Sequence, residues 1–255
     1  MKKLKPLKPE TRKLLAQCSS ATLTTQLFKR GFRNVFLIGL QPLNPNAPVM
    51  VGEAYTLRYI PAREDLDHLG VFEDWEHPQR KAVEEIPSGH VLVMDCRGDM
   101  RAASAGSILV TRMMMRGAAG VVTDGGLRDS PGIAALPFPT YAQGPSAPTN
   151  LIHHHAVDLN VPIACAGVGV YPGDVIFGDA EGVVVIPRHL ADEVAKDAHG
   201  QERFEAFVTE KVWEGRSIFG LYPPRDAAKK EYASWKPKGS GRSKGKAKKR
   251  GRGKK

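Results

Sequence analysis

The sequence predicts an α/β fold with a single folded domain, and three observations support this prediction. Short apolar, β-branched runs typical of buried strands alternate with segments that have helical periodicity. The 255 residues include 42% hydrophobic and 25% charged side chains, an ordinary composition for a globular protein. No run of about 18 consecutive apolar residues occurs, so no membrane-spanning helix is expected. The basic N-terminal residues lack the apolar core of a signal peptide, so we expect a cytoplasmic protein with no membrane partner.

The first elements in chain order are predicted from capping residues and composition. Residues 10–30 are expected to form one or two short helices, because Ser and Thr offer caps and Gly31 ends the run. Residues 51–61 have the composition of a strand. Residues 65–85 are polar and acidic, and we expect a helix there that leads to Pro87.

The middle of the chain is predicted to alternate between buried strands and a helix. The runs VLVMD (91–95) and AGVVTDGG (119–126) are of the buried-strand type. Between them, residues 107–117 fit a helix closed by glycine, and the methionines at 113–115 are expected to fill core space. Three further strands and a long amphipathic helix are predicted at residues 140–144, 161–170, 182–187 and 190–215.

The net charge of +10 is located at the C-terminus. Residues 236–255 hold eleven Lys or Arg and no acid, and removing those charges leaves about −1 for the first 235 residues. This tail lacks hydrophobic periodicity and is expected to be disordered. Its charge can attract RNA, DNA or anionic surfaces non-specifically, but it is equally consistent with a solvated appendage that has no partner.

The cysteines and a histidine cluster are weak candidates for functional groups. Cys18, Cys96 and Cys165 are scattered and odd in number, so we expect buried thiols and no disulfide framework. The three histidines at 153–155 are consecutive and therefore point in different directions, which disfavours a metal site. We expect this segment to be a helix with one or two packed histidines.

Residues 105–133 carry the most chemical information. Gly106 to Leu109 would open a helix whose unbonded N–H groups bind anions such as carboxylate or phosphate. One helix and one strand later, the chain returns to the same sheet edge with Arg128 and Asp129, so both segments are expected to face one pocket. The alternative is that this pair is only a local ion pair in a loop. No Walker-type loop or GxGxxG motif follows the strands, so nucleotide binding has little support.

These motifs resemble the RraA-like family. The resemblance rests on GSIL (106–109), RGAAGVVTDG (116–125), Arg-Asp (128–129) and a second block at 161–187 that is similar to the family's Asn-x-Pro-Val and Gly-Val-x-Val-x-Pro-Gly-Asp region. The family includes 4-hydroxy-4-methyl-2-oxoglutarate aldolases, related class II pyruvate aldolases and a regulator of ribonuclease activity.

The resemblance implies the architecture and the assembly. It implies a ββα sandwich of the swivelling-domain type, assembled as a homotrimer or homohexamer with active sites at subunit interfaces. The catalytic domain is expected at residues 21–220. We expect three flanking segments: an N-terminal extension at 1–20, a C-terminal extension at 221–235 and the basic tail at 236–255.

The resemblance also implies the roles of individual residues. Asp129 would hold a divalent cation, Mg²⁺ or Mn²⁺ or another, largely through water, and Arg128 would bind a 2-oxo acid. A neighbouring subunit would supply an acid from its C-terminal helix. Spacing back from Gly215 makes Glu205 the nearest match and Glu202 the second, although both are also consistent with solvent-facing helix charges. The backbone amides implied in substrate binding belong to Gly106, Ser107, Ile108 and Leu109.

The expected reaction is cleavage of a 4-hydroxy-2-oxo acid, such as 4-hydroxy-4-methyl-2-oxoglutarate, to pyruvate. A chelated cation stabilises the enolate of pyruvate, and oxaloacetate decarboxylation passes through the same enolate. A Schiff-base mechanism is disfavoured because no lysine occurs between Lys81 and Lys196.

Ser107 departs from the family pattern, because many relatives carry an acid before the twenty residues that precede Arg-Asp. Serine cannot act as a carboxylate base, so water, Asp99 or Asp124 would have to take this role, or the substrate differs. The alternative function is a non-catalytic regulator that binds ribonuclease E. The basic tail and the missing acid favour this alternative.

Overall fold

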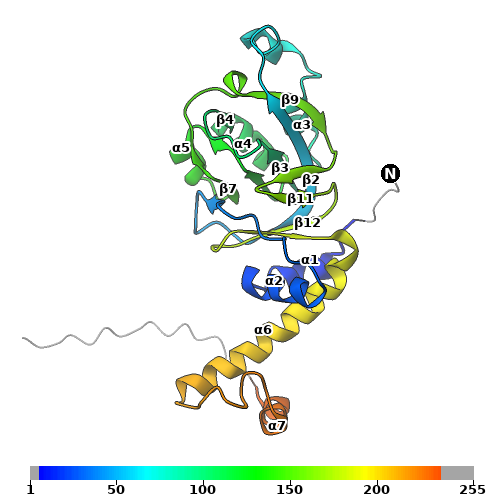
Figure 1. Cartoon of the computed structure of the whole chain (residues 1–255), viewed down its shortest axis with the longest axis vertical. Helices are drawn as coiled ribbons and strands as arrows, with labels where there is room; N and C mark the ends of the chain where they lie inside the picture. Colours follow the sequence, from blue (N-terminus) through cyan, green and yellow to red (C-terminus); the bar gives the residue numbers. More distant parts are fainter. Residues whose placement is uncertain (1–5, 237–255) are drawn as a thin grey trace, which may run out of the picture. The chain divides into compact units, whose positions relative to one another are not determined.

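The computed structural model describes residues 6–236, and its centre is a mixed eight-stranded sheet (Figure 1). The strand order is β1-β7-β5-β3-β2-β12-β13, with β9 also paired to β2. Neighbours from β2 to β7 are parallel, whereas β1, β9, β12 and β13 pair antiparallel to their neighbours. The strands are β1 (Gln41–Pro42), β2 (Met50–Pro61), β3 (His90–Asp95), β5 (Gly120–Thr123), β7 (Thr140–Ala142), β9 (His154–Leu159), β12 (Val175–Gly178) and β13 (Val183–Ile186).

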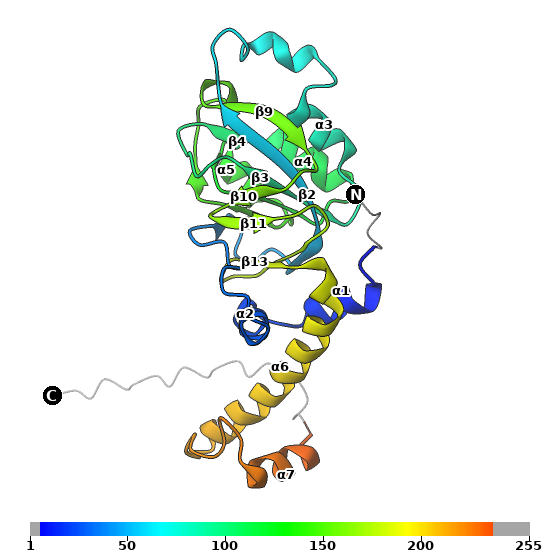
Figure 2. The ribbon, with the colours of Figure 1, turned by 45° about the vertical axis from the view of Figure 1, so that its right-hand side comes forward.

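Side chains of alternate residues on the central strands enter two different cores. Leu92 and Met94 of β3 pack beneath α3 (Pro78–Glu85), α4 (Ser107–Met115) and α5 (Ser130–Ala134), which cover one face (Figure 1). Val91 and Val93 point to the opposite face, which is covered by the antiparallel hairpin of β10 (Ile163–Cys165) and β11 (Val168–Val170) (Figure 2). The apolar run recognised in the sequence is therefore a strand buried on both faces.

A third core lies where two N-terminal helices pack on the antiparallel end of the sheet. Helices α1 (Pro9–Leu15) and α2 (Ser20–Lys29) share this core with β12, β13 and the first part of α6 (Ala191–Trp213). The side chain of Ser19 accepts a hydrogen bond from the Thr22 amide and thereby caps α2. The two helices predicted in residues 10–30 are confirmed.

Residues 153–155 do not form a helix, which corrects the prediction. The reason is the length of β2: residues 50–53 pair with β12, and residues 57–61 continue beyond it and pair with β9. Strand β9 places His154 in the core, where its ring packs on Tyr59 and its Nε2 lies 3.1 Å from the carbonyl oxygen of Ala102. One or two packed histidines were expected, but in a helix and not in a strand.

Other local predictions differ from the structure in extent. The helix expected at 65–85 begins only at Pro78, preceded by a 3₁₀ segment at Leu69–Glu73 with no buried side chain. Only Met113 of the three methionines is fully buried, and Met115 is 72% exposed. Strand β12 was not predicted as a strand. All three cysteines are buried, and none forms a disulfide within the described residues.

The chain separates into two compact units, with the boundary between Gln201 and Glu202 inside α6. In the second unit, Phe207 and Leu221 form a small core with α7 (Asp226–Ser234), a helix that was not predicted. The domain end predicted at residue 220 falls within this unit. The tail predicted to be disordered lies, from residue 237 onward, outside the described residues. Among residues 6–236, no helix is long and apolar enough to cross a membrane.

Candidate active site

The start of α4 and the Arg128-Asp129 turn lie side by side because two short parallel strands precede them. Strand β4 (Ala103–Ala105) pairs with β6 (Gly126–Leu127), and β6 pairs with β8 (Gly144–Pro145). The chain leaves β4 into Gly106 and leaves β6 into Arg128, whose amide donates to the Ala105 carbonyl at 3.1 Å. The structure thus brings together the two segments that the sequence predicted to share a pocket.

The carboxylate of Asp129 binds the N-terminus of α4. Its Oδ2 accepts hydrogen bonds from the Ser107 amide at 3.1 Å and from the Ser107 hydroxyl at 3.2 Å. The Asp129 carboxylate therefore occupies the position at the helix N-terminus where unbonded amides bind an anion. Oδ1 accepts no hydrogen bond from any described residue and lies 3.9 Å from the Nε of Arg128.

Asp129 has a left-handed backbone, with φ 58° and ψ 29°. Aspartate tolerates this region better than most residues, although it costs some energy. The conformation turns the chain directly from β6 into α5, where the Asp129 carbonyl accepts from the amides of Gly132 and Ile133. The left-handed turn therefore aims the Asp129 side chain back at α4 while the main chain continues into the next helix.

Gly106 is required by the close approach of these two segments. A Cβ atom at this position would lie 2.8 Å from Asp129 Oδ2 and 2.9 Å from Arg128 Cγ. Contacts this short require the Asp129 and Arg128 side chains to shift, so a residue with a side chain at position 106 would displace the predicted pair.

A cavity of about 280 Å³ opens beside this contact. It is lined by five of the six residues predicted for the site, and Ser107 is not among the lining residues although it binds Asp129. Sequence reasoning missed the lining residues that come from α3, from the 3₁₀ segment before α3, from β4 and from the segment before β9. Those additional lining residues are Phe72, Gln79, Arg80, Ala103, Ala105, Thr149 and Asn150.

Arg128 and Asp129 both have side chains that are 47% exposed. The Arg128 guanidinium makes no hydrogen bond to another residue within the described part of the chain, and its planar fork matches the geometry of a carboxylate. At the start of α4, the amides of Ile108 and Leu109 precede the first helical hydrogen bond, which runs from Val110 to Gly106. The cavity therefore combines a cation and backbone donors with one acid.

Asp129 is the only acidic residue among those that line the cavity. Within residues 6–236, no group of three or more His, Cys, Asp or Glu side chains is placed to hold a metal ion. This donor set does not fit a closed zinc site, which needs several protein ligands. It fits Mg²⁺, which often keeps most of its waters and binds one or two carboxylates.

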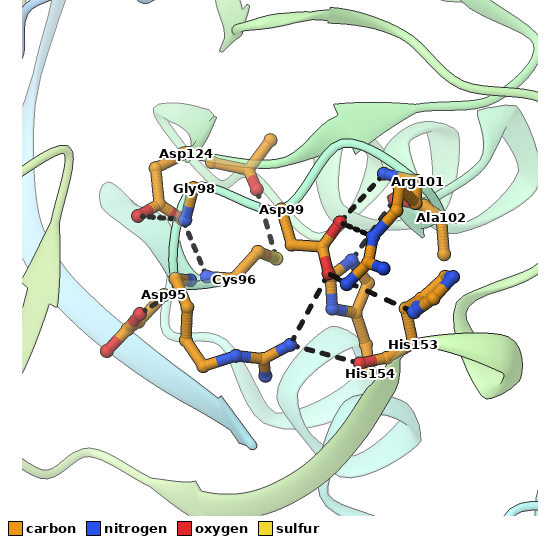
Figure 3. Close-up of polar contacts among 11 residues, drawn as sticks. Asp95, Cys96, Gly98, Asp99, Arg101, Ala102, Asp124, His153 and His154 are labelled. Carbon is orange, nitrogen blue, oxygen red and sulfur yellow. Dashed lines mark hydrogen bonds and ion pairs between the residues drawn. The ribbon is translucent and has the colours of Figure 1, made fainter. Parts of the chain in front are cut away.

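Asp124 does not line the cavity, so it does not supply the carboxylate that is missing at position 107. Figure 3 shows its polar contacts. Asp124 is buried, and its carboxylate accepts from the amides of Cys96 at 2.6 Å, Gly98 at 3.1 Å and Ala166 at 3.2 Å. Burial raises the pKa of Asp124. Its contacts join the loop after β3 to the β10–β11 hairpin, so its role is structural.

Asp99 is also outside the cavity lining and is enclosed by basic side chains (Figure 3). Arg101 donates to it from Nε at 3.0 Å and from Nη2 at 2.7 Å, and these bonds hold the pKa of Asp99 well below its usual range. His153 Nδ1 lies 3.9 Å away. Neither proposed substitute for the missing acid is therefore placed at the site.

Glu205, the residue predicted to act from a neighbouring subunit, belongs to the second unit. Its Oε1 accepts a hydrogen bond from the Tyr222 hydroxyl at 2.9 Å within that unit. Its role toward another subunit stays a prediction.

Comparisons with known proteins identify the family to which this sequence is similar. A family model described as Aldolase/RraA matches residues 20–185, well over half of the chain. A protein of Halalkalibacterium halodurans, provisionally named a 4-hydroxy-4-methyl-2-oxoglutarate aldolase, is 36% identical over 159 residues, which cover 62% of this chain and 69% of that protein.

Solved structures share the fold. Streptomyces coelicolor RraAS2, described as an unusual member of the RNase ES inhibitor RraA protein family, matches with a TM-score of 0.70 and 30% identity over 80% of this chain and 98% of its own. An uncharacterized protein from Pseudomonas syringae pv. tomato matches with a TM-score of 0.76 and 23% identity, covering 86% of this chain and 96% of its own. The predicted RraA-like α/β fold is confirmed, and the chain belongs to the RraA-like aldolase family.

Proposed function

We propose that this protein is a divalent-metal-dependent lyase that cleaves a 4-hydroxy-2-oxo acid to pyruvate and also decarboxylates oxaloacetate. The observation that carries the proposal is the convergence of Arg128, Asp129 and the α4 N-terminus on one cavity. The name of the Halalkalibacterium relative supports 4-hydroxy-4-methyl-2-oxoglutarate as a substrate.

Each group of the chain has a defined task in this proposal. Arg128 binds the carboxylate of the 2-oxo acid, and the amides of Ile108 and Leu109 donate to the same end of the substrate. Ser107 orients Asp129 through its amide and hydroxyl. A divalent cation held by Asp129 supplies, when bound, a Lewis acid that stabilises the enolate charge.

We also propose that the protein assembles as a homotrimer or homohexamer in which a neighbouring subunit completes the site. Ile108 supports this, because its apolar side chain lines the cavity and is 82% exposed. A neighbouring surface would cover it and would reduce the access of water. Glu205 is the residue that we propose a neighbour contributes.

A non-catalytic regulator of a ribonuclease E-type enzyme is the second candidate function. The match to RraAS2, described as belonging to an RNase ES inhibitor family, favours it. The eleven basic residues at the C-terminus, which would strengthen contact with an RNA-bound partner, also favour it.

Pyruvate release distinguishes the two candidates. Oxaloacetate and 4-hydroxy-4-methyl-2-oxoglutarate are supplied in turn with Mg²⁺, and then with a chelator. The lyase proposal expects turnover that the chelator abolishes and that Asp129→Ala removes. Asp158→Ala is the matched control, because Asp158 pairs with Arg58 and does not line the cavity. Metal-independent product release that is equal in both variants would refute the lyase proposal.

A further inference from the structure

Arg80 is a second cationic group in the same cavity, and its guanidinium has no ionic or hydrogen-bond partner within residues 6–236. It lies on α3 and lines the cavity with Arg128. Its guanidinium stacks on the Phe72 ring, with Cζ 4.1 Å from the ring centroid. It makes no hydrogen bond or ion pair in the described structure, and burial lowers its pKa.

The other charged side chains of α3 all have ionic partners. Lys81 pairs with Glu76 and Glu85, and Glu84 pairs with Arg112 at 2.8 Å. The Phe72 ring compensates part of the hydration that this half-buried guanidinium has lost, but it supplies no anion to balance the charge. The contrast with the neighbouring side chains indicates that Arg80 is kept unpaired for a ligand.

Two amide side chains in the cavity lining are also incompletely satisfied. Gln79 and Asn150 are only 2% and 6% exposed. Gln79 donates from Nε2 to the Ser104 carbonyl at 2.7 Å, but its Oε1 has no partner, and neither has the Nδ2 of Asn150. Buried polar atoms without partners are costly and rare, so polar ligand groups or water are expected at this side of the cavity.

We propose that Arg80, assisted by Asn150, binds a second carboxylate at the far end of a dicarboxylic 2-oxo acid, while Arg128 binds the 2-oxo acid end. The two arginines and one aspartate of the lining sum to +1, and the proposed divalent cation would raise this to +3, so a dianionic ligand balances the charge of the loaded cavity better than a monoanionic one. This inference rests on the proposed function, because that function sets which end of the substrate Arg128 holds. It makes Arg80 the residue that selects dicarboxylic substrates.

Binding of two matched ligands tests the inference without turnover. 2-Oxoglutarate and 2-oxopentanoate have five carbons each and differ in the distal carboxylate, and neither carries the 4-hydroxy group needed for cleavage. Calorimetric titration of the full chain with Mg²⁺ should show that the diacid binds about 10- to 100-fold more tightly, the range expected for a hydrogen bond between two charged groups.

Arg80→Met should weaken binding of the diacid to the level of the monoacid and leave binding of the monoacid unchanged. Arg80→Lys, which keeps the charge but loses the planar fork, should keep part of the preference. Arg112→Met is the matched control, because Arg112 pairs with Glu84 and does not line the cavity. Urea unfolding of all three variants shows that a loss of binding does not come from unfolding.

Two results would overturn the subsite. These are equal affinity of the native protein for the two ligands, or an equal loss of both affinities in Arg80→Met. A different result would show that the proposed function is wrong while the subsite is right. In that case oxaloacetate and 4-hydroxy-2-oxo acids are not turned over with Mg²⁺, while the preference for the diacid and its dependence on Arg80 persist.

Discussion

Asp129→Asn separates the charge of this side chain from its structural contacts. Asparagine tolerates a left-handed backbone, and its amide oxygen can still accept from the Ser107 amide and hydroxyl. The variant loses the extra strength that a charged acceptor gives to these hydrogen bonds, and it loses the attraction between the negative charge and the N-terminus of α4. For a half-exposed group these together amount to about 1 kcal/mol of unfolding free energy.

Turnover should fall far more than stability. Without the charge, the cavity has no carboxylate for a divalent cation, and we expect Mg²⁺-dependent pyruvate release to drop by at least about 100-fold. Lactate dehydrogenase-coupled pyruvate release at saturating Mg²⁺ measures this loss, and urea denaturation measures stability. A folded Asp129→Asn protein with turnover within about threefold of the native protein would refute the assignment.

Asp129→Gly also compares the loss of turnover with the loss of stability, but it removes the whole side chain. Glycine removes the side chain but adopts the left-handed backbone without penalty, which returns about 1 kcal/mol and offsets the lost contacts with Ser107. Its stability should therefore be close to that of the native protein, and its turnover should be as low as that of Asp129→Asn.

Three further predictions concern the glycine contact, the tail and a buried histidine. Gly106→Ala should lower the unfolding free energy by about 1–3 kcal/mol and remove most of the turnover, because its Cβ would lie 2.8 Å from the Asp129 carboxylate. The control is Gly200→Ala on α6, whose Cβ would have no atom within 4 Å and which should therefore raise the melting temperature. Deletion of residues 237–255 should leave turnover unchanged and remove any salt-dependent retardation of RNA in a gel, and a large loss of turnover would contradict this. Burial lowers the pKa of His154 below 6.5, so the unfolded chain takes up this proton first as the pH falls. Unfolding free energy in urea should therefore decline below about pH 6.5, and more gradually in His154→Gln than in the native protein.

The elements that sequence reasoning predicted correctly are those whose own residues decide their structure. Strand β3 is buried on both faces and has a continuous apolar run, and α2 has a serine cap and a glycine after its end. Strand β9 is different, because it exists only where β2 extends beyond β12 and offers an unpaired edge. The histidine-rich sequence of β9 does not indicate that this unpaired edge of β2 is available for pairing.

The same distinction applies to the cavity. The predicted alternation of helix and strand was enough to bring Gly106, Arg128 and Asp129 together, although the short parallel strands that precede them, β4 and β6, were not predicted and belong to a separate small sheet. Arg80 reaches the cavity from α3, and it is a candidate ligand-binding residue because its guanidinium has no ionic partner among the described residues. A sequence shows which charges are present but not which of them pair, so Arg80 could not be distinguished from Lys81 before the structure was known.

Ser107 determines which of the two proposed reactions should be faster. Aldol cleavage needs a base for the proton of the C4 hydroxyl, whereas decarboxylation of oxaloacetate releases CO₂ without removing a hydroxyl proton. Asp129 is the only acid among the residues lining the cavity; it binds Ser107, and the proposed function assigns it to the cation. A positioned base contributes about 10²- to 10⁴-fold, so kcat/KM for decarboxylation should exceed that for 4-hydroxy-4-methyl-2-oxoglutarate by at least about tenfold, and only the aldol reaction should accelerate as the pH rises. No base role is assigned to the Glu205 that we propose a neighbouring subunit contributes. Equal rates with flat pH profiles would instead mean that Glu205 acts as this base, and Glu205→Gln should then slow aldol cleavage alone.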